Sequence, residues 1–316
     1  MIQIDNLTKR YGKHFAVDNL NFTVNKGEIF GLLGPNGAGK STTMNIICGY
    51  LSATEGSVLI GGLDVLDHPL EVKKKIGYMP ESPPLYFDMT VLDYLNFVGQ
   101  IKKLTRVQIQ QGIEKSLDLC KIRNVSKRLI KNLSKGYKQR VGLAQAILGD
   151  PEVLILDEPS IGLDPKQIIE MRTLIKDLGK DHTIILSSHI LPEVSAVCQR
   201  VMIINEGKKA ASDTPENLSK RLMGTSSLLL RVDGEKDKIK MALNNIQGTK
   251  KIQFQESPEP NTINITIEAD KTTDIRRQVF HALSKANCPI LQMRNLDMTL
   301  EDIFLHLITK EKEVSN

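Results

Sequence analysis

The chain has no tryptophan and few other aromatic residues, and its cysteines are few and scattered. Scarce aromatics argue against a base-stacking surface for single-stranded nucleic acid. The four cysteines, Cys48, Cys120, Cys198 and Cys288, show no metal-binding or redox spacing, which indicates reduced thiols. No apolar run approaches the roughly 18 residues that span a membrane. The N-terminus also lacks a charged-then-apolar signal pattern, so we expect a cytoplasmic chain.

The positive charge is unevenly distributed. The net charge is +5, and residues 102–140 alone hold 12 basic and 2 acidic residues. This region is either a solvated helical surface or a surface that faces anionic lipid headgroups or an acidic partner loop. Nucleic acid is the weakest of the three alternatives and is not expected as a partner, because no recognised nucleic-acid motif accompanies the charge.

A glycine-rich loop stands between an apolar run at 29–33 and a helical pattern at 41–47. The loop consists of Gly34, Pro35, Asn36, Gly37, Ala38, Gly39, Lys40, Ser41 and Thr42. It matches the spacing G-x-x-x-x-G-K-[ST] in a strand–loop–helix setting, which disfavours an ordinary glycine-rich turn. Glycines let the backbone N–H groups point inward, and the helix N-terminus adds partial positive charge. We therefore expect a triphosphate here, with Lys40 at the β- and γ-phosphates and the Ser41 hydroxyl on Mg²⁺.

Two adjacent acids follow a second apolar run. Residues 153–156 are apolar and precede Asp157 and Glu158, which predicts a buried parallel strand with acids at its carboxyl end. Ligand sites of open α/β sheets form at that end. We expect Asp157 to hold Mg²⁺ through water and Glu158 to position the attacking water. His189 follows a neighbouring strand at 183–187, where it is either a γ-phosphate contact or an unrelated surface histidine.

The remaining pattern divides the chain into parts. Two antiparallel strands precede the loop, and Tyr11 within them is either a purine-stacking or a packing side chain. Prolines after residue 79 interrupt the strand pattern, and helical periodicity follows at 91–104 and 107–120. Ser134 is a predicted N-cap of a helix that reaches about residue 148. Beyond a boundary at 224–227, strands and helices alternate in a ferredoxin-like β-α-β-β-α-β order, followed by an amphipathic helix at 300–308.

Taken together, these motifs resemble the ATP-binding cassette (ABC) family over residues 1 to about 222. Residues 34–42 look like its Walker A loop, 153–158 like Walker B with the catalytic glutamate, and 133–137 like the signature sequence. The resemblance also implies roles for five residues outside the Walker A and Walker B segments. They are Tyr11 at adenine, Ser134 and Gly136 in the signature, Asp164 in the D-loop at 161–164, and His189 as the switch histidine.

Two departures from that family pattern stand out. Lys135 and Tyr137 replace the usual Gly and Gln of the signature, whereas Ser134 and Gly136 remain. Glu81 stands where the family has its Q-loop glutamine, so the resemblance implies a role for Glu81 in metal binding and catalysis. The alternative is that Glu81 turns outward and only caps the proline-rich loop. The sequence around it is similar to the gliding-motility and multidrug branch of type-2 ABC exporters.

The sequence therefore predicts an α/β P-loop NTPase of the ABC type, with a mixed sheet core, an antiparallel β subdomain and a helical subdomain at about 85–150. Residues 1–223 form the expected ATP-binding domain, and 226–316 form a small α+β ferredoxin-like domain for a regulatory ligand, dimer contacts or scaffolding. The resemblance implies an Mg²⁺-dependent ATPase on the inner face of the cell membrane. Two copies would sandwich ATP head to tail and drive a separate transmembrane permease, most simply for export. A non-transport ABC ATPase in regulation, translation or repair is the alternative.

Overall fold

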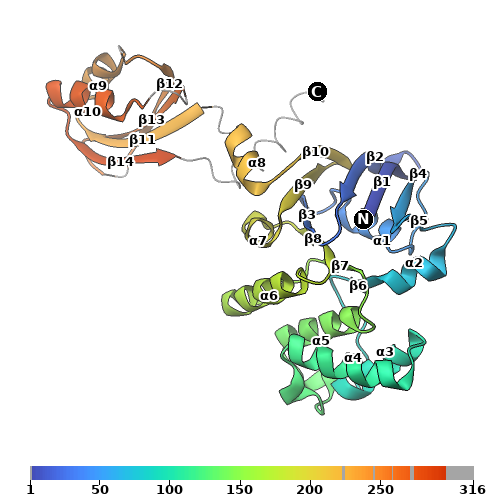
Figure 1. Ribbon diagram of the computed structural model, residues 1–316. Helices are drawn as coiled ribbons and strands as arrows, with labels where there is room; N and C mark the ends of the chain where they lie inside the picture. Colours follow the sequence, from blue (N-terminus) through green and yellow to red (C-terminus); the bar gives the residue numbers. More distant parts are fainter. Residues whose placement is uncertain (1, 223–224, 245, 258, 271–273, 297–316) are drawn as a thin grey trace. The chain divides into compact units, whose positions relative to one another are not determined.

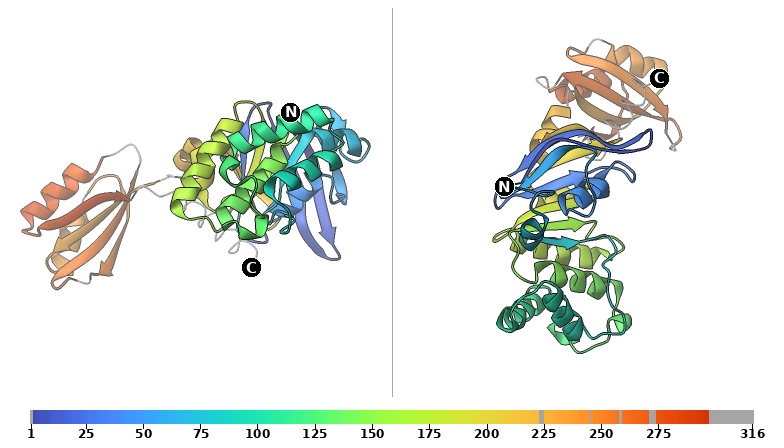
Figure 2. Two further views of the ribbon diagram at one scale, coloured as in Figure 1. Left: turned by 90° about the horizontal axis from the view of Figure 1, so that it is seen from below. Right: turned by 90° about the vertical axis from the view of Figure 1, so that its right-hand side faces the viewer.

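The computed structural model describes residues 2–222, 225–244, 246–257, 259–270 and 274–296 (Figure 1). Its contacts divide the chain into two compact units, Met1–Pro215 and Glu216–Asn316. The first unit carries two sheets and most of the helices, and the second carries one sheet with helices on it (Figure 2). Among the described residues, no helix combines the length and the apolar character needed to cross a bilayer.

The central sheet of the first unit has six strands in the order β10-β9-β3-β8-β7-β6. The strands are β3 (Ile29–Leu33), β6 (Ile76–Met79), β7 (Val153–Asp157), β8 (Thr183–Ser188), β9 (Arg200–Asn205) and β10 (Lys208–Asp213). All neighbours pair in parallel except β10, which forms an antiparallel hairpin with β9. Strands β3, β7 and β8 are buried throughout, as apolar parallel strands covered on both faces must be. Their carboxyl ends consequently share one edge of the sheet.

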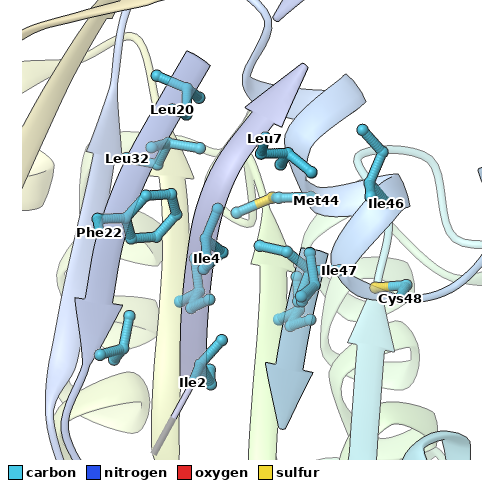
Figure 3. Close-up of a cluster of buried hydrophobic side chains, with 14 of the residues drawn as sticks. Ile2, Ile4, Leu7, Leu20, Phe22, Leu32, Met44, Ile46, Ile47 and Cys48 are labelled. Atoms are coloured by element: carbon cyan, nitrogen blue, oxygen red, sulfur yellow. The ribbon is translucent and has the colours of Figure 1, made fainter. Parts of the chain in front are cut away.

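A smaller antiparallel sheet packs on the same core. It consists of β1 (Ile2–Tyr11), β2 (His14–Val24), β4 (Glu55–Ile60) and β5 (Leu63–Asp64), in the order β2-β1-β4-β5. Helix α1 (Lys40–Ile47) contributes Met44 and Ile47 to one cluster with Ile4 of β1 and Leu32 of β3 (Figure 3). Each such buried side chain stabilises the fold by about 1.5–3 kcal/mol. This shared core fixes α1, and with it the loop before α1, against the central sheet.

The predicted helical subdomain is present. It contains α3 (Val91–Ile101), α4 (Arg106–Leu119), α5 (Lys135–Ile147) and two short 3₁₀ turns at Arg123–Val125 and Ile130–Asn132. Each helix begins after a hydroxyl residue whose side chain accepts a backbone N–H of the first turn, namely Thr90, Thr105 and Ser134. The predicted N-cap at Ser134 is confirmed. Helix α5 runs back toward the central sheet, where it contacts β6.

Lys102, just after α3, closes the other end of α5. Its Nζ donates to the carbonyls of Gln145 (3.0 Å) and Leu148 (2.6 Å), which have no partner within the helix. Burial lowers the pKa of Lys102 to about 8. A buried cation thus joins the end of α3 to the end of α5.

Three helices of the first unit were not predicted from the sequence. They are α2 (Pro69–Lys75), α6 (Pro165–Leu178) and α7 (Leu191–Val197), and each has a proline at its first or second position. Proline there loses no intrahelical hydrogen bond, so this position marks a helix start that a pattern search for apolar periodicity overlooks. The short α2 and α7 present too few turns for such periodicity to emerge.

The second unit begins with α8 (Pro215–Leu222) at the boundary. Its remaining elements are β11 (Thr225–Asp233), α9 (Lys236–Leu243), β12 (Thr249–Glu256), β13 (Thr262–Asp270), α10 (Arg276–Lys285) and β14 (Ile290–Leu296). The strands form one antiparallel sheet in the order β12-β13-β11-β14. The elements follow the β-α-β-β-α-β order, and their core is apolar, with Leu230, Ile265 and Leu283 wholly buried.

The division between the two units falls at Pro215, before the predicted boundary at 224–227. Residues Thr225 to Ser227 pair with Asp270 to Glu268 as the start of β11. Small polar residues suggest a linker, but the backbone pairing with β13 overrides that composition. The predicted helix at 300–308 lies outside the described residues.

Candidate active site

The glycine-rich loop connects β3 to α1 at the shared carboxyl edge of the central sheet. Gly39 has φ of +102°, and a Cβ there would collide with the Ala16 carbonyl. A Cβ at Gly34 would lie 2.5 Å from the Ile204 carbonyl oxygen. Glycine is therefore required at both positions for the loop to curl tightly between β2 and β9. The loop leads directly into the N-terminus of α1, whose free N–H groups favour an anion.

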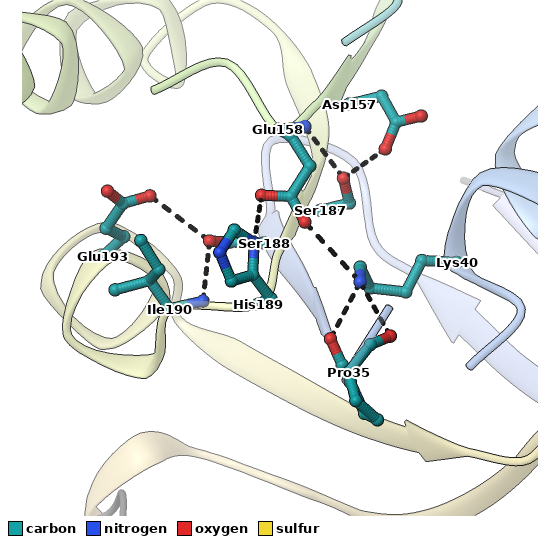
Figure 4. A network of polar contacts seen from close by, with 10 residues as sticks. Pro35, Lys40, Asp157, Glu158, Ser187, Ser188, His189, Ile190 and Glu193 are labelled. Atoms are coloured by element: carbon teal, nitrogen blue, oxygen red, sulfur yellow. Dashed lines mark hydrogen bonds and ion pairs between the residues drawn. The ribbon is translucent and has the colours of Figure 1, made fainter. Parts of the chain in front are cut away.

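The Lys40 side chain folds back into this loop and is only 6% exposed. Its Nζ donates to the Gly34 carbonyl (2.8 Å) and the Pro35 carbonyl (3.2 Å), and lies 3.5 Å from Glu158 Oε1 (Figure 4). A buried ammonium group is costly unless it is paired and hydrogen-bonded. The carbonyls and the carboxylate meet that requirement, and they hold one positive charge where the predicted phosphates would lie.

The two acids emerge from β7 as the sequence predicts. Asp157 ends the strand opposite Ser187 of β8, and both residues are buried. The Ser187 hydroxyl donates to Asp157 Oδ1 (2.5 Å) and accepts from the Glu158 backbone N–H (2.9 Å). Glu158 has φ of 47°, a left-handed conformation that costs a non-glycine residue of order 1 kcal/mol or more. The resulting turn directs the Glu158 carboxylate toward Lys40 rather than along the strand.

His189 completes this group. Its Nδ1 lies 2.9 Å from Glu158 Oε2, while the other carboxylate oxygen faces Lys40 (Figure 4). The histidine side chain is 38% exposed, whereas that of Glu158 is 8% exposed. The structure therefore brings Lys40, Glu158 and His189 together, with Asp157 beside them through Ser187. A carboxylate held between a cation and an imidazole at the mouth of an anion-binding loop is suited to orienting a nucleophilic water.

Sequence reasoning missed the hydroxyl and acid residues that support this group. Ser187 bridges Asp157 and Glu158, and Ser188 donates to Glu193 Oε2 at 3.2 Å. Burial raises the pKa of Glu193, which is 6% exposed. The paired serines at the end of the predicted strand 183–187 were a usable signal, because polar residues at the carboxyl ends of parallel strands face the site.

The residues predicted for the signature and the D-loop form a second group. Ser134 and Asp164 accept backbone N–H groups as the N-caps of α5 and α6, respectively. A Cβ at Gly136 would lie 2.6 Å from the amide oxygen of Gln167 in the first turn of α6, and Lys135 covers Gly162. The segments 133–137 and 161–167 are thus neighbours in one chain. Among the described residues, no side-chain hydrogen bond or ion pair joins this group to Lys40, Glu158 or His189.

Tyr11 and Glu81 are both exposed to solvent. Tyr11 is 52% exposed, with the Lys9 ammonium 5.3 Å from its ring centroid, so it is not a core packing residue. Glu81 is exposed after β6, and its backbone carbonyl accepts from Gln139 Nε2 at 3.3 Å. Within the described parts of the chain, no group of three or more His, Cys, Asp or Glu side chains is arranged to hold a metal ion. A metal at Asp157 would thus take hydroxyl, water or substrate oxygens as most of its other ligands, with at most one further carboxylate.

Known proteins share this organisation. A family model for ABC transporters matches residues 17–161. The chain is 31% identical to the linearmycin resistance ATP-binding protein LnrL of Bacillus subtilis, over 97% of this chain and 98% of that protein. It is 39% identical to the bacitracin transport ATP-binding protein BcrA of Bacillus licheniformis, over 70% of this chain and 72% of that protein.

Solved structures agree with the sequence relatives. The ATP-binding subunit of an ABC transporter superposes with a TM-score of 0.64 and 28% identity, over 70% of this chain and 92% of that one. A dimeric bacterial ABC transporter cassette gives a TM-score of 0.62 and 26% identity, over 68% and 98%. Fold and site therefore define a nucleotide-binding cassette ATPase. The chain belongs to the ATP-binding proteins of ABC transporters, and the resemblance seen in its sequence is confirmed.

Proposed function

We propose that this chain is the ATP-hydrolysing subunit of an exporter and that it drives a separate transmembrane permease. The observation that carries the proposal is the Glu158 carboxylate held between Lys40 and His189 beside the phosphate loop. The proteins named for linearmycin resistance and bacitracin transport support the export direction, and the first of them matches along nearly its whole length.

Each residue of the site has a role that follows from its position. Lys40 and the loop N–H groups bind the β- and γ-phosphates, and His189 contacts the γ-phosphate from the opposite side. Glu158 orients the attacking water and takes up its proton. The site residues would hold Mg²⁺, which would supply positive charge to neutralise developing phosphate charge. Its proposed ligands are Ser41 at the start of α1, Asp157 through water, and Glu81, which follows the strand β6 paired with β7.

The two separate groups of site residues support a head-to-tail pair of chains. In the proposed assembly, each ATP lies between the loop 34–42 of one copy and Ser134, Gly136 and Asp164 of the other. Tyr11 of the first copy covers the adenine. That the relatives of known structure include a dimeric cassette supports this arrangement.

The division of labour along the chain follows. Residues 1–223 are the proposed ATP-binding domain, with the helical subdomain at about 85–150, and 226–316 are an accessory domain. The permease would hold the chain at the inner face of the membrane through the loop 81–86 and the basic helical subdomain. Tyr86 at the end of that loop and the adjacent Phe87 are 54% and 52% exposed, as a docking surface requires.

A single variant tests this proposal. Glu158→Gln keeps the shape of the side chain but removes the base, so we expect ATP turnover to fall about 100-fold or more while Mg-ATP still binds. Size-exclusion chromatography at saturating Mg-ATP should then show a stable dimer, with Lys40→Ala as the monomeric control. Normal turnover by a Glu158→Gln protein that stays monomeric would contradict the proposed role of Glu158.

A further inference from the structure

We propose that Glu193 is a positioning residue for hydrolysis, which fixes the segment Ser188 to Ile190 and thereby holds His189 on Glu158. This inference rests on the proposed function, because it assigns Glu193 an effect through the proposed roles of His189 and Glu158. Neither the sequence motifs nor the comparisons assign a role to Glu193.

The contacts of Glu193 run through one hydroxyl group. Glu193 lies in the first turn of α7, and its Oε2 accepts from Ser188 Oγ at 3.2 Å. The same Oγ accepts from the Ile190 backbone N–H at 3.0 Å. A serine hydroxyl has one proton to donate, so the carboxylate fixes the direction of that proton and leaves the lone pairs to Ile190. The backbone is thereby anchored on both sides of His189 (Figure 4).

The anchored segment touches the two parts of the site that must stay in register. The Ser188 carbonyl accepts from the Gly34 N–H of the phosphate loop at 3.4 Å, and His189 Nδ1 meets Glu158 Oε2 at 2.9 Å. Ser188 is 1% exposed, so water does not readily replace Glu193 as its partner. A shift of Ser188 would move His189 relative to both Glu158 and the phosphate loop. Misplacement by about 1 Å from a remote change can cost 10²-fold in rate.

The surroundings of Glu193 make its negative charge energetically unfavourable. Burial raises the pKa of this carboxyl, Glu158 raises it further, and Ser188, Arg172 of α6 and His189 lower it. Arg172 Nε is itself buried without a hydrogen-bond partner among the described residues. An apolar side chain in the same space would avoid the desolvation of a carboxylate. A buried acid with a specific partner next to the reacting groups is typical of a residue kept for function.

The test measures ATP turnover by the full chain. We expect Glu193→Ala to lower kcat about 10- to 100-fold and to leave KM for Mg-ATP within about twofold. Ser188→Ala should reproduce this loss. Glu193→Gln should stay within about threefold of wild-type kcat, because its amide oxygen also accepts from Ser188. A purely packing role would instead leave kcat unchanged in each correctly folded variant.

The matched control is Glu28→Ala. Glu28 is another acid of the first unit, with a side chain only 10% exposed, and it pairs with Arg200 at the opposite end of β3. Its loss should lower the unfolding temperature and leave kcat unchanged. A Glu28→Ala protein that loses as much kcat as Glu193→Ala would show that any buried acid matters equally, which overturns the proposal.

A double-mutant cycle identifies the route of the effect. In a His189→Ala background, Glu193→Ala should cost less than about twofold more, because its effect passes through His189. A full multiplicative loss would overturn the proposal.

If Glu193→Ala does not fold, Ser188→Ala and Glu193→Gln decide the proposal, and a wild-type kcat in Ser188→Ala contradicts it. Unchanged turnover in Glu158→Gln contradicts the proposed function itself. If Glu158→Gln loses turnover but Glu193→Ala does not, the result contradicts only the role of Glu193.

Discussion

The two units of this chain both have apolar cores, but they differ in the polar groups that they bury. Every polar or charged residue that the structure describes as buried lies in the first unit, and the site residues Lys40, Asp157, Glu158 and Glu193 are among them. The buried core of the second unit is built from Leu, Ile, Val, Ala and Cys. Removing a charge from water costs several kcal/mol unless partners compensate, so a fold does not collect such groups for stability. Their concentration in one unit therefore locates the chemistry.

Sheet topology explains why only one unit can gather these groups. The central sheet of the first unit is mostly parallel, so the carboxyl ends of β3, β7 and β8 and the N-terminus of α1 meet at one edge. Loops at such an edge form ligand sites. The antiparallel sheet of the second unit alternates its strand directions, so strand ends of both kinds share each edge.

The largest effect should follow from Lys40→Ala, which removes a buried charge of the first unit. The phosphate loop loses its only side-chain cation in the sequence 34–42, so we expect ATP hydrolysis to fall at least about 100-fold. Turnover by purified protein, with ATP binding measured in parallel, checks this. Activity near the wild-type level would show that buried charged residues do not locate the function in this chain.

Leu230→Ala tests the apolar core of the second unit. Leu230 is wholly buried in β11, so its truncation should cost about 2–5 kcal/mol of stability in that unit. ATP turnover per folded molecule should not change. Hydrogen exchange of β11 and β13 amides measures the loss, and Met241→Ala, at a residue 76% exposed, is the control. A parallel loss of ATPase activity would show that the second unit shapes the active site.

A smaller effect concerns the buried cation Lys102. Its pKa of about 8 in the folded chain lies below the ordinary lysine pKa of 10.5, so the unfolded chain binds more protons between these values. Wild-type stability relative to Lys102→Met should therefore rise with pH, by about 2 kcal/mol between pH 7 and pH 10. Denaturant unfolding of both proteins at several pH values checks the sign. A wild-type stability that falls relative to Lys102→Met as the pH rises would refute a destabilising burial of this charge.

The sequence was sufficient where a function depends on neighbouring residues. The loop 34–42, the acids after β7 and the cap at Ser134 are all local patterns, because one short segment supplies both the backbone shape and the side chains. The convergence of Lys40, Glu158 and His189 was also expected from motif order. These predictions depend on little more than strand direction.

The partners of the serines at the end of β8 could not be predicted, although serines at a strand end do indicate a site. Ser187 meets Asp157 because β8 pairs with β7, and Glu193 meets Ser188 because α7 turns back after one short segment. Neither partner is marked by spacing. That residues 225–227 form a strand was missed for the same reason, since only the pairing of β11 with β13 shows it.

The central claim is that all nucleotide chemistry belongs to the first unit, and a shortened chain ending at residue 224 tests it most directly. This chain keeps the loop 34–42, Asp157, Glu158 and His189 and lacks the whole β-sheet of the second unit. Calorimetric titration with Mg-ATP should give a Kd within about twofold of the full-length value. A shortened protein that is soluble and folded, as circular dichroism would show, but does not bind ATP would contradict the account.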